Sequence, residues 1–467
     1  MSKKNEYDVI IIGAGIGGLV CGCYLAKAGL STLIVEKNAK PGGYCTSFNS
    51  NGFKFDAFVH SLGSLKKGKI IANVLDDLDI ADRIKFKRYN PSDIVISPDF
   101  KIKFWNNLDK LIEEFQRNFP KESKNIKRFF TYLDDAKSNH VNLRKNTFDQ
   151  VLNEYFDDYK LKAILSIFVL GNLGLPSSKI SAFTAVKFYK QFMLDGGYYP
   201  ENGMQELPNL LASRFEEFNG DLILSSYVKK ILIYDNSVVG IELKNGKKFS
   251  SNNVVSNCDA RQTFFELIGE NRIKKNLIET LNKLNPSLSM VILYLGLDSA
   301  LPGLPREGIN TWILPHYDLD KMYNFSTKNN IKNDTWIMVR LLSDKRSLLV
   351  FASAAFKNHN YWIKNKTFFC DHFIKKAENI IPNLTEHINY RNIATPNTLH
   401  KLTLNYQGAP YGWESTPSQL AVPGLARSID VKNLFLAGHW SALAQGIPGV
   451  TLMGQDVANI IVRKHRH

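Results

Sequence analysis

The N-terminal part of the chain alternates between short apolar runs and glycine-rich turns. Residues 7–12 end in a run of aliphatic side chains, which is typical of a parallel strand buried on both faces. Small and apolar residues over 16–28 predict a helix that packs closely on this strand, and Gly29 follows where a helix-ending glycine is expected. Residues 32–35 predict the next strand. This order of strand, helix and strand indicates a nucleotide-binding type of architecture.

The middle of the chain has a different pattern. Residues 121–143 are charged and amphipathic and predict a helix, whereas residues 161–175 and 180–194 are markedly apolar. Two interpretations of the apolar stretches stay open. They form core helices or the walls of an apolar substrate tunnel, which we favour, or part of their surface enters a bilayer with Lys187 and Lys190 at the headgroups.

The second half of the chain is dominated by predicted strands. Alternating and β-branched runs, with Asn245-Gly246 as a hairpin turn, predict strands over 222–225, 229–234, 238–243, 247–249 and 254–256. Further strands are expected over 290–297, 335–342 and 348–354, followed by a helix over 367–381. The last segment predicts a strand over 433–437, a glycine-rich loop and a helix over 449–463. No internal repeat or low-complexity linker separates these segments, so we expect interwoven domains.

The glycines after the first predicted strand form a GxGxxG motif. Gly13 permits a tight turn, Gly15 lets the backbone approach a pyrophosphate, and Gly18 allows close packing of the helix. The helix that begins at Ile16 offers N–H groups and a positive dipole to the phosphates. Glu36, at the end of the second strand, is spaced to accept hydrogen bonds from an adenosine ribose. This segment therefore predicts a bound adenine dinucleotide.

Two further glycine-rich segments indicate which dinucleotide is expected. Residues 41–47 hold a glycine pair whose backbone could continue along an extended pyrophosphate and ribityl chain, which nicotinamide enzymes do not need. Residues 434–450 place another glycine turn before a helix, whose N-terminal dipole could stabilise negative charge at the edge of a reduced flavin. FAD fits all three segments. The residues expected to bind it are Gly13, Gly15, Ile16, Gly18, Glu36, Lys37, Gly42, Gly43, Thr46, Ser47, Gly438, His439, Gly446, Ile447, Gly449 and Val450.

Together these motifs resemble those of the phytoene desaturase, carotenoid isomerase and retinol saturase superfamily. Residues 52–56 and 197–204 add to the resemblance, which spans the chain but is loose over 80–195 and 300–400. It implies an α/β fold in which a doubly wound, Rossmann-like FAD-binding domain is interwoven with a mixed-sheet and helical substrate domain. The implied segments are 1–78, 204–270 and 425–467 for FAD, 79–203 for the helical part and 271–424 for the sheet part of the substrate domain. It also implies that Val228 lies beside the adenine and that an apolar tunnel brings a polyene to the isoalloxazine ring.

Three positions depart from the pattern of similar proteins. Ala57 follows Asp56 where members often have glycine, and His439 stands where many have an acidic residue. The second change removes an expected ribityl or phosphate contact, which an imidazole could replace. Tyr44 stands where the related amine oxidases have arginine, which argues modestly against an amine oxidase.

Candidate catalytic groups are few. His60 follows Asp56 in a segment that similar proteins place beside the cofactor, so we expect it to be the acid or base that moves a proton. The alternative is a histidine that only hydrogen-bonds the flavin or a carbonyl group. For His439 we expect cofactor binding rather than catalysis. Cys45 is expected to be a small buried residue, because nothing nearby in sequence would activate its thiol.

Composition and charge narrow the class of protein. The chain has 467 residues and a net charge of +15, which would suit an anionic membrane surface. Abundant Lys, Asn and Ile also indicate an A/T-rich coding sequence, so this contact stays open. We find no nucleic-acid-binding motif and expect no nucleic acid partner. Five scattered cysteines without a CxxC motif predict a reducing compartment, no disulfide framework and no metal site. Residues 9–26 lack charge but hold too many glycines for a membrane-spanning helix.

The expected protein is a cytoplasmic oxidoreductase, with peripheral membrane contact as an open alternative and the oligomeric state left unpredicted. It would act with FAD on C–C and C=C bonds of an apolar polyene such as a carotenoid or retinoid, by desaturation, saturation or cis–trans isomerisation. Without a second GxGxxG motif, electrons would pass to a quinone, to oxygen or back to the substrate. One alternative is an FAD-dependent oxidase of amines, amino acids or a secondary metabolite. Another is a lipid-binding or scaffold protein that keeps FAD as a structural element.

Overall fold

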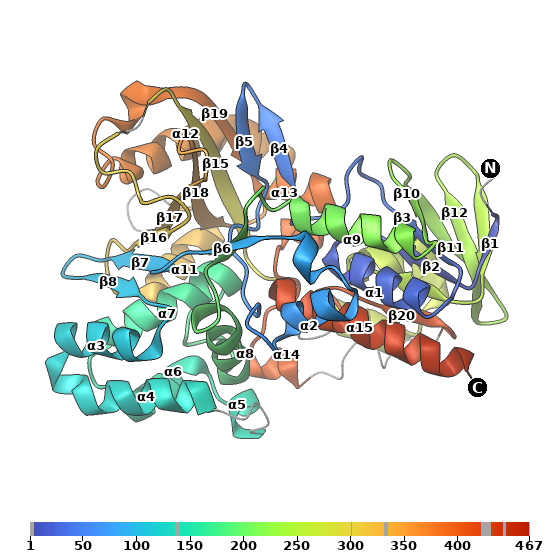
Figure 1. The fold of residues 1–467 in the computed structure, drawn as a ribbon, viewed down its shortest axis with the longest axis horizontal. Coiled ribbons are helices and arrows are strands. Elements are labelled where there is room, and N and C mark those ends of the chain that lie inside the picture. The colour runs from blue at the N-terminus through green and yellow to red at the C-terminus, as the bar shows by residue number, and fades with distance from the viewer. Residues whose placement is uncertain are drawn as a thin grey trace.

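A five-stranded parallel sheet forms the centre of one half of the molecule (Figure 1). Its strand order is β10 (Asp221–Ile223), β3 (Thr32–Val35), β2 (Val9–Ile12), β14 (Val254–Ser256) and β20 (Leu434–Leu436). Three segments that are far apart in sequence therefore lie side by side, while the exact domain boundaries stay a prediction. The structure is a computed structural model that describes residues 4–135, 141–299, 301–330, 335–421, 431–441 and 445–466.

Both faces of the parallel sheet are covered. Val9 and Ile11 of β2 belong to a cluster with helices α1 (Ile16–Lys27), α9 (Glu206–Glu217) and α15 (Gly446–His465). Ile10 and Ile12 belong to a second cluster, with the four-stranded sheet made of β1 (Glu6–Tyr7), β13 (Lys248–Ser251), β12 (Ser237–Leu243) and β11 (Val228–Tyr234). The alternation places each strand between two layers. The predicted doubly wound α/β fold is confirmed.

Helices α1 and α15 cross at very short range. A Cβ atom added to Gly454 of α15 would lie closer than 3.0 Å to the backbone oxygen of Gly17 in α1. Only glycine permits this approach, because it has no side chain at the crossing point. The N-terminal glycine turn and the C-terminal segment are therefore held together through their backbones.

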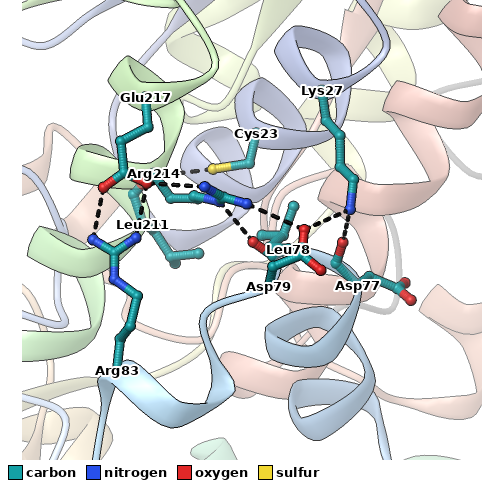
Figure 2. Close-up of polar contacts among 9 residues, drawn as sticks. All are labelled: Cys23, Lys27, Asp77, Leu78, Asp79, Arg83, Leu211, Arg214 and Glu217. Atoms are coloured by element: carbon teal, nitrogen blue, oxygen red, sulfur yellow. Dashed lines mark hydrogen bonds and ion pairs between the residues drawn. The ribbon is translucent and has the colours of Figure 1, made fainter.

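A polar network ties α1 to α9 and to the segment after α2 (Ile70–Asp77) on the surface of this layer (Figure 2). Arg214 of α9 donates to Asp79 Oδ2 at 3.1 Å and to Glu217 Oε2 at 3.0 Å. Lys27 of α1 donates to the same Asp79 carboxylate at 3.2 Å. These contacts join α1, the helix that follows the glycine turn, to its neighbours in this layer.

The other half of the molecule is organised around a seven-stranded mixed sheet. Its order is β19 (Ile388–Ala394), β15 (Ser289–Leu297), β18 (Ser347–Ala354), β17 (Ile337–Leu341), β16 (Asn310–Ile313), β7 (Asp93–Ile96) and β8 (Lys101–Phe104). Successive residues of β15, such as Ile292 and Leu293, belong to hydrophobic clusters on opposite faces of the sheet. The strands predicted over 290–297, 335–342 and 348–354 are confirmed, whereas β7, β8, β16 and β19 are not indicated by the sequence pattern.

Helices cover the two faces of this sheet. Helix α12 (His359–Ala377) lies on one face and begins earlier than the helix expected over 367–381. The other face carries α3 (Leu108–Asn118), α4 (Ser123–Asp135), α5 (Val141–Lys145), α6 (Phe148–Tyr155), α7 (Tyr159–Leu173) and α8 (Ala182–Phe188).

The two apolar stretches are helical. Helix α7 is buried on nearly all sides and is a core helix, while α8 continues into a π-helical turn, Tyr189–Met193. The helix predicted over 121–143 is present as α4 and α5, and residues 136–140 lie outside the described part. No helix in the described ranges is long and apolar enough to cross a membrane. Peripheral contact with a membrane stays a prediction.

Candidate cofactor and substrate site

A large cavity lies at the carboxyl ends of the parallel strands. Gly13, Glu36, Asn257 and Gly438, which follow β2, β3, β14 and β20, all line it. Ligands of doubly wound folds bind at this edge of the sheet. The space inside, including solvent at the open mouth, is about 1850 Å³, and the lining extends from the glycine turn to helix α8 (Ala182–Phe188).

The glycine turn between β2 and α1 forms one wall of the cavity. Gly13 has a positive φ of 98°, which favours glycine. Gly15 is the N-cap residue of α1 and supplies no side-chain cap, so the first N–H groups of the helix lack a side-chain acceptor. The second glycine pair is held against this turn, because Gly42 donates its N–H to Ala14 O at 2.8 Å. The result is a backbone cradle suited to a pyrophosphate.

The carboxylate of Glu36 is buried beside the same turn. Its Oε2 accepts from the N–H of Ala14 at 2.9 Å, and its Oε1 accepts from the N–H of Asn38 at 2.8 Å. Each carboxylate oxygen keeps a further lone pair that can accept from a ribose hydroxyl. Lys37 donates to Asn38 Oδ1 and to Lys401 O, both at 3.0 Å. This end of the cavity is therefore fixed by charged and backbone groups.

Asn257 is a site residue that the sequence pattern does not indicate. It follows β14, and its Nδ2 donates to Gly13 O at 3.3 Å. A Cβ atom added to Gly438 would lie 2.6 Å from Asn257 Oδ1, so the amide fits between the glycine turn and the segment after β20. No local motif marks this residue. The available signal is its position at the carboxyl end of a strand next to the glycine-bearing strand.

The C-terminal wall is the start of α15. The helix begins at Gly446, three residues before the predicted 449, and its N-cap residue Gln445 makes no side-chain cap bond. Two buried polar atoms at this wall, Gln445 Oε1 and His439 Nε2, have no hydrogen-bond partner among the described residues. Burial lowers the pKa of His439 to about 4, so its imidazole is neutral at pH 7. Residues 442–444 lie outside the described part of the chain.

Most of the residues predicted to bind FAD line this one cavity. They are Gly13, Gly15, Ile16, Glu36, Lys37, Gly42, Gly43, Val228, Gly438, His439, Gly446, Ile447 and Val450. Those that do not line it are Gly18, Thr46, Ser47 and Gly449. Gly18 lies under the turn, Thr46 Oγ1 donates to Gly43 O at 3.1 Å, and Ser47 Oγ donates to Asp56 Oδ1 at 2.7 Å. Contact of each residue with the cofactor stays a prediction.

His60 lines the same cavity, on the substrate side. Its Nδ1 is buried without a partner among the described residues, and its ring centroid lies 5.3 Å from that of Phe351. Burial, aided by the positive charge of Arg340, lowers the pKa of His60 to about 3. The imidazole is therefore neutral at pH 7 and a weak base. Its catalytic role stays a prediction.

Aromatic side chains form much of the substrate-side wall. The ring of Phe58 lies 5.0 Å from that of Tyr44 and 5.9 Å from that of Tyr411. On α8 and the turn after it, Phe188 and Phe192 stack at 5.2 Å. All five residues line the cavity. Cys45 lies there too, buried as predicted, and burial raises the pKa of its thiol.

The cavity has the features of a site for a bound dinucleotide. Side chains in place of its glycines would fill the cradle. The N-termini of α1 and α15 reach the cavity without side-chain caps. Buried polar atoms at His60, Thr184, His439 and Gln445 have no protein partner in the described ranges and call for a ligand or water. A cradle suited to a dinucleotide at the edge of a parallel sheet, beside an aromatic wall, is the arrangement expected of a flavoprotein of the Rossmann-like class.

Comparison with known proteins identifies the family. The chain matches the flavin containing amine oxidoreductase family over residues 16–462 and belongs to it. The all-trans-retinol 13,14-reductase of Danio rerio is 22% identical, over 99% of this chain and 87% of its own length. A 4,4'-diapophytoene desaturase (4,4'-diapolycopene-forming) of Methylomonas sp is 24% identical, over 99% of this chain and 96% of its own. The predicted resemblance to desaturases and retinol reductases is confirmed.

A solved structure of putrescine oxidase bound to putrescine has the same fold. The TM-score is 0.69 at 16% identity, and the match covers 98% of this chain and 99% of that one. Family and fold together establish a flavin-containing oxidoreductase whose cofactor is FAD.

Proposed function

We propose that this flavoprotein catalyses redox or isomerising chemistry on C–C and C=C bonds of an apolar polyene, such as a carotenoid or retinoid. The observation that carries the proposal is the chemistry of the substrate-side wall. Phe58, Phe188, Phe192 and Tyr411 supply aromatic surface along the cavity. An extended apolar molecule would lose water-exposed surface against them on binding.

The charges at the wall argue against an amine as the substrate. Glu36 is the one carboxylate among the described residues that line the cavity, and it accepts hydrogen bonds from the backbone at the glycine turn. Nothing anionic on the described substrate side would pair with an ammonium group. The two curated relatives above are named for acting on retinol and on a diapophytoene, which supports the same substrate class.

The protein and the cofactor have separate tasks in this proposal. FAD supplies hydride acceptance and donation when bound. The aromatic wall excludes water and orients the carbon chain, while the N-terminus of α15 offers a positive dipole at the cofactor side of the cavity. His60 is the candidate for a proton transfer, in its neutral form.

The test is anaerobic reduction or oxidation of the flavin by candidate substrates. The FAD-loaded protein is mixed with retinol, with phytoene or with putrescine, and the flavin absorption is followed in its oxidised and photoreduced forms. We expect a polyene to change the redox state of the flavin, or to be isomerised without a net change of that state, and putrescine to leave the flavin unchanged. Bleaching by putrescine and by no polyene would instead establish an amine oxidase.

A structural flavin is the remaining outcome of the same experiment. A flavin that is photoreduced, then reacts with neither substrate, oxygen nor a soluble quinone, and isomerises no polyene would have no catalytic access. That result would overturn the proposal, which requires that the cofactor and the substrate meet in the cavity. Product analysis after a single turnover distinguishes desaturation, saturation and isomerisation.

A further inference from the structure

One helix face brings both apolar and polar groups into the substrate side of the cavity. Thr184, Lys187, Phe188, Gln191 and Phe192 line the cavity from α8 and its π-helical continuation. Their spacing of three and four residues places them on one side of the helix. The two phenylalanines form an apolar stripe, and the other three residues form a polar stripe beside it.

The polar stripe has no protein partners in the described part of the chain. Lys187 makes no hydrogen bond or ion pair there, and neither does the side-chain amide of Gln191. Thr184 Oγ1 is buried and without a partner among the same residues. An ammonium group that is partly withdrawn from water and left unpaired costs free energy. This cost is present in the free protein, and an anionic ligand that pairs with the ammonium group would offset it.

The charges around Lys187 make the electrostatic potential at this part of the cavity more positive. Glu36, Lys37 and Lys187 are the residues with a formal charge among the described ones that line the cavity, and Glu36 and Lys37 lie at the glycine turn with partners of their own. Burial lowers the pKa of Lys187, and the nearby guanidinium of Arg144 lowers it further. Arg144, on α5, stacks over the Phe183 ring at 4.5 Å. Lys187 is therefore the one cation at this end of the cavity among the described lining residues, and the exposed Arg144 adds positive charge from outside the cavity.

We propose that Lys187, with Thr184 and Gln191, binds a terminal oxyanion of the substrate. The substrate would then be amphipathic: an apolar unsaturated body lies along the aromatic wall, and a single carboxylate or phosphate at its end is held by the ammonium group. A charge-assisted hydrogen bond in a partly desolvated site is among the stronger polar contacts in proteins. This assignment rests on the proposed function and narrows its substrate class.

The test compares ligands that share one polyene body and differ at the end. Retinoic acid and retinol are titrated into the full-length, FAD-loaded protein at neutral pH, and the change in flavin absorption gives each dissociation constant. Geranylgeranyl phosphate and geranylgeraniol form a second pair, which distinguishes a phosphate from a carboxylate. The variants are Lys187→Gln and, as a matched control, Lys145→Gln, which removes an exposed charge on the neighbouring helix α5.

We expect the native protein and Lys145→Gln to prefer at least one of the two anionic ligands over its alcohol by roughly 10-fold or more. Lys187→Gln should remove that preference while binding the alcohol as before. Its ligand-free form should melt no lower than the native protein, because an unpaired charge is removed. A lysine needed only for folding would instead lower the melting temperature in that variant.

Three outcomes overturn the assignment. The first is equal binding of acid and alcohol in both pairs, and the second is a preference that survives in Lys187→Gln. The third is a shift of the flavin spectrum in ligand-free Lys187→Gln, because Lys187 would then contact the cofactor. Equal binding leaves the proposed polyene chemistry standing, whereas failure of every polyene to bind refutes both proposals.

Discussion

The packing of Gly18 under the glycine turn gives a sharp test of the cofactor site. A Cβ atom at this position would lie closer than 3.0 Å to the backbone oxygen of Gly13. That oxygen belongs to the turn itself, so it can move only if the cradle for the pyrophosphate moves. Gly22, one turn further along α1, is a matched control. Its added Cβ would lie 2.6 Å from the Cδ1 methyl group of Ile34, the far end of a flexible side chain.

The expected magnitudes separate the two substitutions. Alanine is favoured over glycine in a helix interior by about 1 kcal/mol, while overpacking a core costs about 1–3 kcal/mol and occasionally more. For Gly22→Ala the two effects nearly cancel. For Gly18→Ala we expect the upper end of the cost, and thus a net loss of about 2 kcal/mol or more. Displaced N–H groups should also weaken FAD binding by roughly 10-fold or more, because a factor of ten needs only about 1.4 kcal/mol.

The assay follows FAD retention and stability in the same sample. The ratio of flavin to protein absorption gives cofactor occupancy after gel filtration, and flavin fluorescence reports its release during a urea titration. Gly18→Ala should lose most of its FAD and release the rest at lower urea, while Gly22→Ala should resemble the native protein. Equal occupancy and equal midpoints for both variants would refute the packing argument.

Three further predictions concern charged and titrating groups. Glu36→Gln replaces an acceptor oxygen with a donor opposite a backbone N–H, so FAD should bind the apoprotein roughly 10-fold more weakly in a fluorescence titration. The pKa of His60 is lowered from 6.5 to about 3, so flavin reduction in the native protein and in His60→Gln should follow the same pH profile between about 5 and 8; a native inflection near 6.5 that the variant lacks would contradict this. Hydrogen bonds from Arg83 and Arg214 lower the pKa of Glu217 from 4.5 to about 2. The stabilisation of the folded protein by this carboxylate is therefore present above pH 4.5 and is lost as the pH falls towards 2. Arg214→Met should accordingly lower the melting temperature at neutral pH, by an amount that shrinks in acid, and an unchanged difference at low pH would show that charge is not the cause.

The features that the sequence predicts well are local ones. The GxGxxG turn and its flanking strand and helix are decided by residues within a few positions of one another, and the observed α1 ends where Gly29 predicts. Glu36 follows from a fixed spacing within the same βαβ unit. The parallel sheet is likewise indicated by runs of aliphatic residues that must be buried on both faces.

The features that the sequence does not predict depend on distant partners. Strand β7 begins at Asp93, a residue that weakens any strand pattern, yet its carboxylate is buried and accepts from Trp312 Nε1 at 2.8 Å and Asn310 Nδ2 at 2.9 Å. Those donors lie on β16, more than two hundred residues later in the chain. The position of Lys187 in the cavity wall has the same origin, because nothing in its neighbourhood along the sequence shows that it faces a cavity.

The backbone crossing of α1 and α15 also bears on how the protein is made. The first helix of the cofactor domain contacts Gly454, and the parallel sheet is completed by β20, so a nascent chain that has reached only the middle of the sequence has no finished cofactor site. Domains usually fold as units during synthesis, the N-terminal one first. Here the glycine turn is synthesised hundreds of residues before Gly454 and β20, and the apolar strands beside the turn lack these partners until then. Binding of free FAD should therefore begin only after α15 has left the ribosome, and ribosome-bound chains halted before α15 should not retain it.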